Sequence, residues 1–437
     1  MSSKVAQAAA SAVSTLTERS LKDEITAANQ KAVQRILEAE ATLVDIKPAI
    51  KAIPGFKADL ITHAGPPVAW ERMCKPQKLA VMNAIRYEGL ADTLDEAERK
   101  VRMGEVIVEP NHNYNNVSGM CGVTSANMPV FIVEDRVHGN RAFDWQQTDM
   151  TSFGQSYEEG AKEIEFVQGT LAPVMAAAIR VGGGLDVKQL LAQGLQMGDE
   201  LHGIFDATRG AFLNWILPHL LRTDFPKETL AQVGDYFSTY SGRWYCGNMM
   251  MGACKVMMDA ARGIRFSTVV TAMARNGVEF GVKVSGLGDR WFLGPAGEIK
   301  GFMFPGFRPE ESTLDIGDSA ISESRGLGGT ALPASPSQAR LLGENFQSAL
   351  DHTRAMREVS TAEDPLFRIP YMDFMGVPVG IDIRKVVQSG TVPKIDTGMA
   401  HREGGHGIIG TGISEAPMIA FRRALVAFGE EYASETK

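Results

Sequence analysis

The sequence predicts a multi-domain protein of the α/β to α+β class, from three changes of pattern along the chain. After an N-terminal helical arm, short apolar strands alternate with helices, then helical spacing dominates, and finally glycine turns separate strands. The predicted parts are a helical arm with an α/β domain over residues 1–150, a helical domain over 151–265, and a mixed α+β domain with glycine-rich loops over 266–437. A chain of 437 residues can bury the large core that this arrangement needs.

The composition excludes several classes of partner. The net charge of -8 is spread without a basic run, which argues against nucleic acid and anionic membrane surfaces. The N-terminus lacks the features of a signal peptide, and no stretch of about 18 apolar residues predicts a membrane span, so we expect a cytoplasmic protein. Four cysteines are far apart and form no C-x-x-C pair, so each is expected to be reduced and buried: Cys74, Cys121, Cys246 and Cys254.

The first predicted elements are a helical arm and a strand that ends in a fixed loop. Residues 14–50 show helical spacing, with Thr15 and Glu18 in capping-box register. A short apolar run then ends at the loop 63–67, HAGPP, where two prolines prevent the strand from continuing. In open α/β sheets, ligands bind at such strand ends. A helix is expected from about Gln77.

Residues 104–145 are predicted to form strands on either side of a polar loop. The loop, which includes residues 111–116, is rich in asparagine. Because asparagine favours turns, we expect a surface loop and keep a ligand site as the alternative.

Residues 156–262 show helical spacing, with many methionines and alanines and few charges. Most of these helices are expected to be buried in a bundle or an oligomer interface, and we expect a homodimer formed through this region. Asp199, His202 and Asp206 would share one helical face, with Glu200 beside them, and resemble a metal-binding set. No second set of ligands follows, so no metal is expected.

The stretch 391–417 is the most unusual part of the chain. It crowds glycines, histidines and charged residues between a predicted strand and a predicted last helix, which begins near Pro417. Glycines leave the backbone amides bare and a helix N-terminus attracts negative charge, so this stretch is suited to hold an anion. The alternative is a tight turn that carries the chain onto the helix. Upstream, we expect a strand over 278–284 and a helix over about 337–358.

The glycines at 405, 407 and 410 match G-x-G-x-x-G, but the surrounding pattern does not predict a nicotinamide site. Such a site follows a buried strand directly and needs an acidic residue about 20 positions later, whereas here a charged segment precedes the glycines. The sequence also contains neither H-E-x-x-H nor G-x-S-x-G, so metallopeptidase and serine hydrolase chemistry have no support. No cofactor is expected.

Four polar, glycine-rich loops are predicted to converge on a site that holds an anion and moves a proton, at residues 63–67, 285–290, 315–329 and 396–412. The candidates for catalysis are Asp396, His401 and Arg402, and those for substrate binding are His63, Gly65, Asn276, Ser285, Arg290, Asp318, Ser319, Arg325, Gly405, Gly407, Gly410 and Gly412.

Seven ordered motifs resemble the YlbE/AllG-like bacterial family over nearly the whole chain. They are HAGPPVAWERMC (63–74), SANMPVFIVED (125–135), MGDELH (197–202), MARNGVEFGVKVSGLGDRWF (273–292), DIGDSAISESRGLGG (315–329), GIDIRKVV (380–387) and DTGMAHREGGHGIIGTG (396–412). The resemblance implies a subunit of oxamate carbamoyltransferase that works beside FdrA-like and AllH-like proteins in anaerobic allantoin use. That reaction joins the small anions oxamate and carbamoyl phosphate to give oxalurate and phosphate.

For carbamoyl transfer, the resemblance leads us to assign the glycine loop to phosphate, Arg290 and Arg402 to the anionic ends, and His401 or Asp396 to the proton. The usual carbamoyltransferase signature, Ser-Thr-Arg-Thr with a later His-Pro-x-x-Gln, is absent, so the site must differ.

The chain also departs from the family pattern. Asp396 stands where the family has Asn, Ile408 where it has Gln, residues 203–205 where it has Asn-Arg-Asn, and QQTDMTSF (146–153) where it has an acidic, arginine-containing stretch. These departures are consistent with a paralogue that acts on another acyl or carbamoyl donor. The alternative is a non-catalytic scaffold or ligand-binding subunit of an FdrA-type complex.

Overall fold

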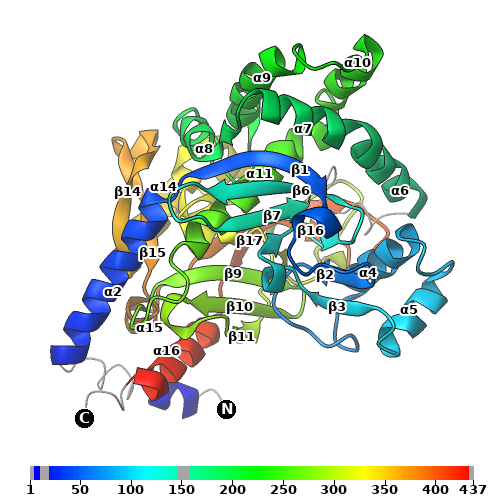
Figure 1. The fold of residues 1–437 in the computed structure, drawn as a ribbon. Helices are drawn as coiled ribbons and strands as arrows, with labels where there is room; N and C mark the ends of the chain where they lie inside the picture. The colour runs from blue at the N-terminus through cyan, green and yellow to red at the C-terminus, as the bar shows by residue number, and fades with distance from the viewer. Residues whose placement is uncertain (1–3, 10–18, 146–156, 433–437) are drawn as a thin grey trace.

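The sheet that crosses the middle of the molecule in Figure 1 has five strands in the order β4-β7-β6-β1-β8. The structure is a computed structural model that describes residues 4–9, 19–145 and 157–432. The strands of this sheet are β1 (Ala41–Pro48), β4 (Asn116–Val117), β6 (Pro129–Asp135), β7 (Arg141–Trp145) and β8 (Leu185–Asp186). The run of β-branched and aromatic residues in β6 is buried along almost its whole length, because the sheet is covered on both faces.

Helix α11 (Tyr240–Asp259) packs against β1, β6 and β7 and lies at the centre of the largest hydrophobic core. Its methionines and alanines make it apolar on every side, and Met249, Ala253 and Met257 are fully buried. The same core takes in residues from Ala32 to Val379 and therefore crosses both predicted domain boundaries. The three-part division of the chain stays a prediction.

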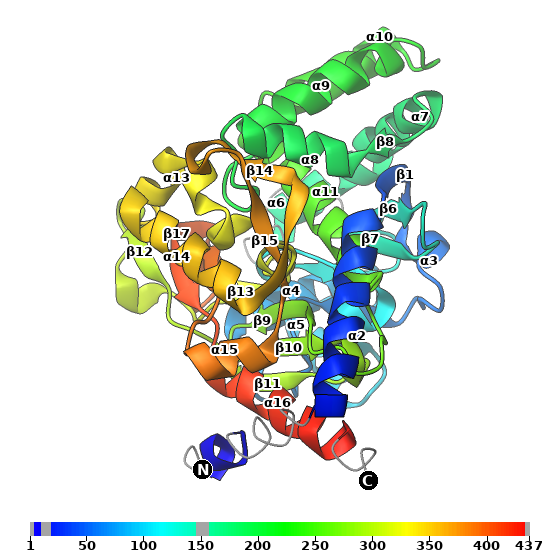
Figure 2. The ribbon, with the colours of Figure 1, turned by 90° about the vertical axis from the view of Figure 1, so that its left-hand side faces the viewer.

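The predicted helical region forms a series of helices before α11. They are α6 (Tyr157–Phe166), a π-helical turn (Val167–Leu171), α7 (Ala172–Val181), α8 (Val187–Gln196), α9 (Asp206–Leu220) and α10 (Lys227–Tyr236). α7 and α8 pack against β1, while α9 and α10 lie at the top of Figures 1 and 2. By length and composition, the helix Gly160–Val181 is long and apolar enough to cross a membrane, which the sequence did not lead us to expect; 50% of its most apolar window is buried inside the molecule. The core helix of a globular protein meets the same criterion.

A second sheet lies below the first in Figure 1, in the order β11-β10-β9-β13. Its strands are β9 (Val270–Asn276), β10 (Glu279–Val284), β11 (Phe292–Pro295) and β13 (Ile316–Gly317). The C-terminal helix α16 (Met418–Tyr432) packs against β10 and β11, with α15 (Ile383–Ser389) beside it. The strand predicted over 278–284 and the helix predicted to begin near Pro417 are confirmed.

The N-terminal part carries a smaller sheet in the order β3-β2-β5. Its strands are β2 (Leu60–His63), β3 (Ile107–Pro110) and β5 (Val123–Thr124), and the helices in this part are α3 (Ala49–Ala52), α4 (Lys75–Tyr87) and α5 (Leu94–Arg102). The first described long helix, α2 (Arg19–Glu38), packs against α11 instead. The predicted arm is helical only to Glu38, because the β-branched residues that follow form β1. Thr15, Glu18 and the stretch 146–153 lie outside the described residues.

The segment between the second sheet and the hairpin β14–β15 contains three α-helices. The elements are α12 (Ile321–Arg325), α13 (Pro336–Leu341), α14 (Phe346–Val359), β14 (Ser360–Ile369) and β15 (Met375–Ile381). The single helix predicted over 337–358 is thus two helices, because Gly343 adopts a φ of 83° between them.

Another three-stranded sheet, in the order β12-β17-β16, replaces the loop predicted for residues 391–417. Its strands are β12 (Lys300–Met303), β16 (Lys394–Ala400) and β17 (Ile408–Glu415). Gly301 and Gly412 face each other across β12 and β17, and a Cβ atom on Gly412 would lie 2.3 Å from the carbonyl oxygen of Lys300. The glycines in β17 are therefore required by the close approach of a neighbouring strand. They do not form a loop of bare amides that runs into α16.

Candidate active site

A cavity of about 180 Å³ lies between segments that are far apart in the sequence. Its polar side chains come from five places. They are Asp396 and Thr397 from β16, Thr411 from β17, His202 from the segment between α8 and α9, Ser319 from the segment between β13 and α12, and Gln338 from α13. Apolar residues form the rest of the wall, including Met120, Trp244, Phe304, Ile316, Leu341 and Ile408. A few converging polar groups in an apolar wall are typical of a site for a small molecule.

The carboxyl group of Asp396 is buried in the wall of this cavity. Its Oδ2 accepts a hydrogen bond of 3.0 Å from Nε2 of Gln338. Burial raises the pKa of Asp396 to about 6, although the charge of His202 and hydrogen bonds from Gln338 and Glu200 act in the opposite direction. A carboxyl group that titrates near neutral pH is suited to accept and return a proton.

Glu200 is a second, fully buried carboxyl group, and it is close enough to Asp396 to feel its charge. Its Oε1 accepts backbone N–H groups of Gly203 at 2.5 Å and Ile204 at 2.8 Å, whereas no donor group in the described part of the chain reaches Oε2. Burial and the charge of Asp396 raise the pKa of Glu200 well above its usual value. Two neighbouring carboxyl groups away from water disfavour each other's charged form.

His202 and Glu323 form a buried pair beside these carboxyl groups. Nδ1 of His202 donates to Oε1 of Glu323 at 2.8 Å, and only 9% of the His202 side chain is exposed. Burial alone lowers the pKa of His202, but Glu323, with a contribution from Asp396, more than offsets this effect and the pKa is raised. Because Nδ1 is engaged by Glu323, Nε2 is the ring nitrogen left for a ligand, and the ring favours its positively charged form.

Arg275 of β9 organises the hydroxyl groups at the back of the cavity. Its guanidinium is fully buried and forms an ion pair of 2.9 Å with Asp315. It also donates to Oγ of Ser319 at 3.2 Å and to Oγ1 of Thr397 at 3.1 Å. The hydroxyl group of Thr397 in turn donates a hydrogen bond of 3.0 Å to Oδ1 of Asp315. The hydroxyl proton of Ser319 is therefore the one left to point toward a ligand in the cavity.

Asp318 forms another buried cluster, which shows that the surface-loop prediction for residues 111–116 is wrong. Its carboxylate accepts hydrogen bonds from the backbone of Gly65 at 2.7 Å, Nδ2 of Asn111 at 2.9 Å and the backbone of Ser118 at 3.0 Å. Asn111 is fully buried. Asn111 and Asn116 are needed as donors inside the protein, a role that their turn preference does not reveal.

Three of the four predicted loops meet in this region. Gly65 joins the loop 63–67 to Asp318, and Thr397 of the stretch 396–412 bonds to Asp315 of the loop 315–329. The fourth loop lies elsewhere: Ser285 is buried and donates to the carbonyl of Ala261, and Arg290 forms a surface ion pair with Glu431.

The other two catalytic candidates, His401 and Arg402, lie in the turn between β16 and β17, away from the cavity. Arg402 is exposed and donates to the backbone carbonyl of Glu310, while the ring of His401 packs 4.4 Å from that of His406. Gly405 is exposed and Gly407 partly exposed in the same turn. Neither His401 nor Arg402 lines the cavity that contains Asp396.

Three predicted binding residues have structural partners instead of a place in the cavity. Nδ1 of His63 lies 2.9 Å from the carbonyl oxygen of Ala64, and Asn276 donates to the carbonyl of Pro66 while its Oδ1 accepts two backbone N–H groups of the following turn. Arg325 is fully buried, forms an ion pair with Asp364 and lies over the ring of Phe367.

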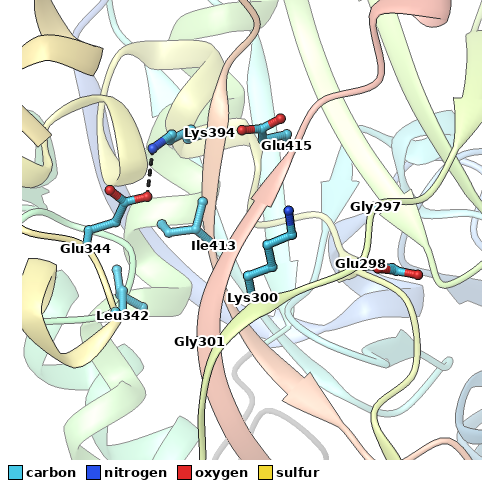
Figure 3. Close-up of a pocket in the computed structure, with 10 residues that line it drawn as sticks. Gly297, Glu298, Lys300, Gly301, Leu342, Glu344, Lys394, Ile413 and Glu415 are labelled. Atoms are coloured by element: carbon cyan, nitrogen blue, oxygen red, sulfur yellow. Dashed lines mark hydrogen bonds and ion pairs between the residues drawn. The ribbon is translucent and has the colours of Figure 1, made fainter. Parts of the chain in front are cut away.

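A larger groove of about 580 Å³ lies beside Lys300 and Lys394 (Figure 3). Lys394 forms an ion pair of 2.7 Å with Glu344 across this groove, and Glu298 and Glu415 add further negative charge. The groove thus has more carboxylates than lysines, and Glu344 already neutralises one lysine. We favour the smaller cavity as the active site, because its titratable groups are buried and converge on one space.

Sequence reasoning missed four of the groups around the cavity: Glu200, His202, Arg275 and Glu323. The available signal was MGDELH (197–202), in which three charged or titratable residues interrupt an apolar pattern. We had placed Asp199, His202 and Asp206 on one helical face, but α8 ends at Gln196 and α9 begins only at Asp206. Among the described residues, no group of three or more His, Cys, Asp or Glu side chains is arranged to hold a metal.

The comparisons with known proteins agree with this architecture. The family model described as oxamate carbamoyltransferase subunit AllG matches residues 106–319. The oxamate carbamoyltransferase subunit AllG of Escherichia coli (strain K12) is 37% identical over 409 residues, which cover 92% of this chain and 97% of that protein. The chain belongs to the AllG-like family. The resemblance drawn from the seven motifs is therefore confirmed.

Two further relatives extend the AllG-like comparison. The uncharacterized protein YahG of Escherichia coli (strain K12) is 40% identical over 424 residues, which cover 96% of this chain and 89% of that protein. The crystal structure of a conserved protein of unknown function from Enterococcus faecalis V583 superimposes with a TM-score of 0.89 at 38% identity, covering 92% of this chain and 97% of that chain. The predicted mixed α/β to α+β class is confirmed for this AllG-like chain.

Proposed function

We propose that this chain is a subunit of an oxamate-carbamoyltransferase-like complex. It would take part in transfer of a carbamoyl, or related acyl, group between a small amide or 2-oxo acid and phosphate. The observation that carries the proposal is that Asp396 and His202 face one cavity of about 180 Å³, one as a proton acceptor and the other as a positive charge. The 37% identity to the Escherichia coli subunit AllG supports the same function.

The chemistry requires a base. In carbamoyl transfer to oxamate, a bond forms between the amide nitrogen and the carbamoyl carbon, the bond from that carbon to the phosphate oxygen breaks, and the amide nitrogen loses a proton. An amide nitrogen is a weak nucleophile, so the proton must leave as the bond forms. Asp396 is charged at neutral pH, since its pKa is about 6, and we assign it the role of accepting this proton. In the reverse direction it returns the proton.

The same cavity offers groups that hold an anionic substrate. We assign the carboxylate of the small acid to the imidazolium of His202 and the hydroxyl group of Ser319. Glu323 keeps His202 charged and fixes the ring, as a carboxylate often does for a functional histidine. We assign no role in proton transfer to His401 or Arg402, because both lie in the turn between β16 and β17.

The complex needs other chains. The relative is described as a subunit, which supports partner subunits for this chain. We propose that these are FdrA-like and AllH-like proteins, that the chain also forms a homodimer through its helical region, and that the complex works in the cytoplasm.

The experiment that tests the ligand assignment uses the full chain alone and a thermal-shift assay with oxamate, carbamoyl phosphate and inorganic phosphate. We expect oxamate to raise the melting temperature of the wild type and to have a much smaller effect on His202→Asn. An equal response of both proteins would contradict the assignment of the cavity. Ligand binding without turnover, even with partner subunits present, would instead identify a non-catalytic ligand-binding subunit.

A further inference from the structure

A second cavity, of about 20 Å³, adjoins the proposed active site. We call it the inner cavity, and the cavity of about 180 Å³ that Asp396 lines the outer cavity. His202, Trp244 and Ser319 line both, so the two cavities meet at these three side chains. The inner cavity has one further polar lining side chain, Asn248 of α11. Aromatic and methionine side chains complete much of its wall: Phe205, Met250 and Met251.

The inner cavity has room for one group the size of a water molecule. A cavity needs about 10–15 Å³ to hold a water, and the inner cavity is only slightly larger, at about 20 Å³. Its wall is deep in the protein, since Phe205, Asn248, Met250 and Met251 are all buried. A single oxygen or nitrogen atom of a ligand therefore fits this space, whereas a larger group does not.

Asn248 places an amide on a helix that is otherwise apolar in this part. Between Gly247 and Met258, Asn248 and Lys255 are the only side chains with an amide or a charge. Lys255 forms an ion pair with Asp259, one turn further along α11. An amide has two N–H donors and an acceptor oxygen, so Asn248 is able to serve a ligand in the inner cavity as well as the protein.

Hydrogen-bond donors gather where the two cavities meet. Nδ1 of His202 is engaged by Glu323, so Nε2 is the nitrogen left for a ligand, and Ser319 accepts from Arg275 and keeps its own proton to donate. None of the described residues that line the inner cavity carries a carboxyl group. Asp396, in contrast, lines only the outer cavity. The inner end thus suits a group that accepts hydrogen bonds, and the outer end suits one that donates them.

We propose that the small acid binds with its carboxylate at the inner end, one oxygen entering the inner cavity against Asn248, and with its amide nitrogen facing Asp396 in the outer cavity. Asn248 is then a further binding residue, which fixes the orientation of the substrate. This inference deepens the proposed function and rests on it. Oxamate has the required arrangement, because its carboxylate and its amide nitrogen are attached to the same carbon atom. An ionised carboxylate only accepts hydrogen bonds, which matches the donors of the inner end.

The first test is calorimetric titration of the isolated full chain with oxamate. Asn248→Leu keeps a side chain of similar size and removes the N–H donors, so the Kd for oxamate should rise about 10–100-fold, as for loss of a hydrogen bond to a charged group. Met257→Leu is the control, because Met257 is buried in the same helix and lines neither cavity. It should bind oxamate like the wild type. Equal affinity of Asn248→Leu and the wild type, or no binding of oxamate by the wild type, would overturn the proposal.

A second titration needs no variant and therefore decides the question even if Asn248→Leu does not fold. N-methyloxamate carries its extra methyl group at the outer end, where the cavity of about 180 Å³ has room for it, so the wild type should bind it with an affinity similar to that for oxamate. The methyl ester of oxamate has no charged carboxylate, and its methoxy group is too large for the inner cavity, so it should not bind. Loss of binding of N-methyloxamate, or binding of the ester, would contradict the proposed orientation.

Turnover of the reconstituted complex separates this inference from the proposed function. Asn248→Leu should raise the KM for oxamate and leave the KM for carbamoyl phosphate unchanged. If the complex transfers the carbamoyl group and Asn248→Leu has the wild-type KM for oxamate, this inference fails and the proposed function stands. If oxamate binding depends on Asn248 but the wild-type complex transfers no carbamoyl group, the proposed function fails and the binding orientation stands.

Discussion

Nδ1 of His202 lies 2.8 Å from Oε1 of Glu323, and this ion pair is almost completely buried. The same oxygen of Glu323 accepts the backbone N–H groups of Gly329 at 2.9 Å and Asp396 at 3.2 Å. One carboxylate thus connects the segment before α9, the segment after α12 and strand β16. The geometry of the proposed site depends on this single side chain.

Glu323→Gln should therefore affect both stability and ligand binding. The change removes the charge that keeps His202 protonated, and it leaves a buried imidazole with a weaker partner. We expect a loss of about 3–5 kcal/mol in the free energy of unfolding, as for other broken buried pairs. Urea denaturation measures this loss, with Glu358→Gln on the exposed face of α14 as the control. A stability equal to that of the control would show that the pair is not formed.

Gly412→Ala tests whether the glycines of β17 serve packing or an anion. A Cβ atom on this residue would lie 2.3 Å from the carbonyl oxygen of Lys300, so the strands β12 and β17 would have to separate. We expect a destabilisation of about 1–3 kcal/mol. Gly210→Ala in α9 is the matched control, because nothing lies within 4 Å of its added Cβ. Unchanged stability together with lost anion binding would restore the anion-cradle hypothesis.

His352 should make the stability of the fold depend on pH. Burial, with a smaller effect of Lys394, lowers the pKa of His352 to about 4, and its Nε2 accepts the backbone N–H of Lys394 at 3.2 Å. In the unfolded chain the pKa is about 6.5, so the unfolded state binds a proton first as the pH falls. Because of this group, the free energy of unfolding should fall by about 2 kcal/mol between pH 7 and pH 5. Denaturation of His352→Gln at both values should show a smaller pH dependence, and an equal dependence would contradict the assignment.

Arg325 was a predicted substrate-binding residue, and its buried pair with Asp364 predicts a different phenotype. Arg325→Met leaves the Asp364 carboxylate buried without its charge partner, which should cost about 3–5 kcal/mol of stability. The double variant with Asp364→Asn should recover part of this loss, because the unpaired charge is removed. Thermal unfolding of the single and double variants measures the coupling. A stable Arg325→Met protein with a raised KM would return Arg325 to the substrate site.

The sequence was sufficient to find the fold class, the family and two residues that line the candidate cavity, Asp396 and Ser319. Asp396 was visible because a carboxylate among glycines at the end of the chain is unusual. The strand end before the loop 63–67 and the helix after Pro417 were also predictable, since proline and apolar periodicity mark them locally.

The rest of the site depends on contacts between distant segments. Apolar periodicity on both sides of residues 197–205 concealed the break that brings Glu200 and His202 to Asp396. The glycines of β17 were assigned to a loop because their reason, the close approach of β12, is a contact across more than a hundred residues. Asn111 was assigned to the surface because its partner, Asp318, is even more remote, 207 positions away in the sequence.

The most direct test of the proposed function is the turnover of Asp396→Asn in the reconstituted complex. Phosphate release from carbamoyl phosphate in the presence of oxamate would be measured for wild type, Asp396→Asn and the Glu358→Gln control, after confirming that each protein is folded. We predict that Asp396→Asn lowers kcat by about 10²–10⁴-fold, as expected for loss of a general base, while Glu358→Gln matches the wild type. Turnover by Asp396→Asn equal to that of the wild type would contradict the assignment of the proton-accepting group and, with it, the cavity as the catalytic site.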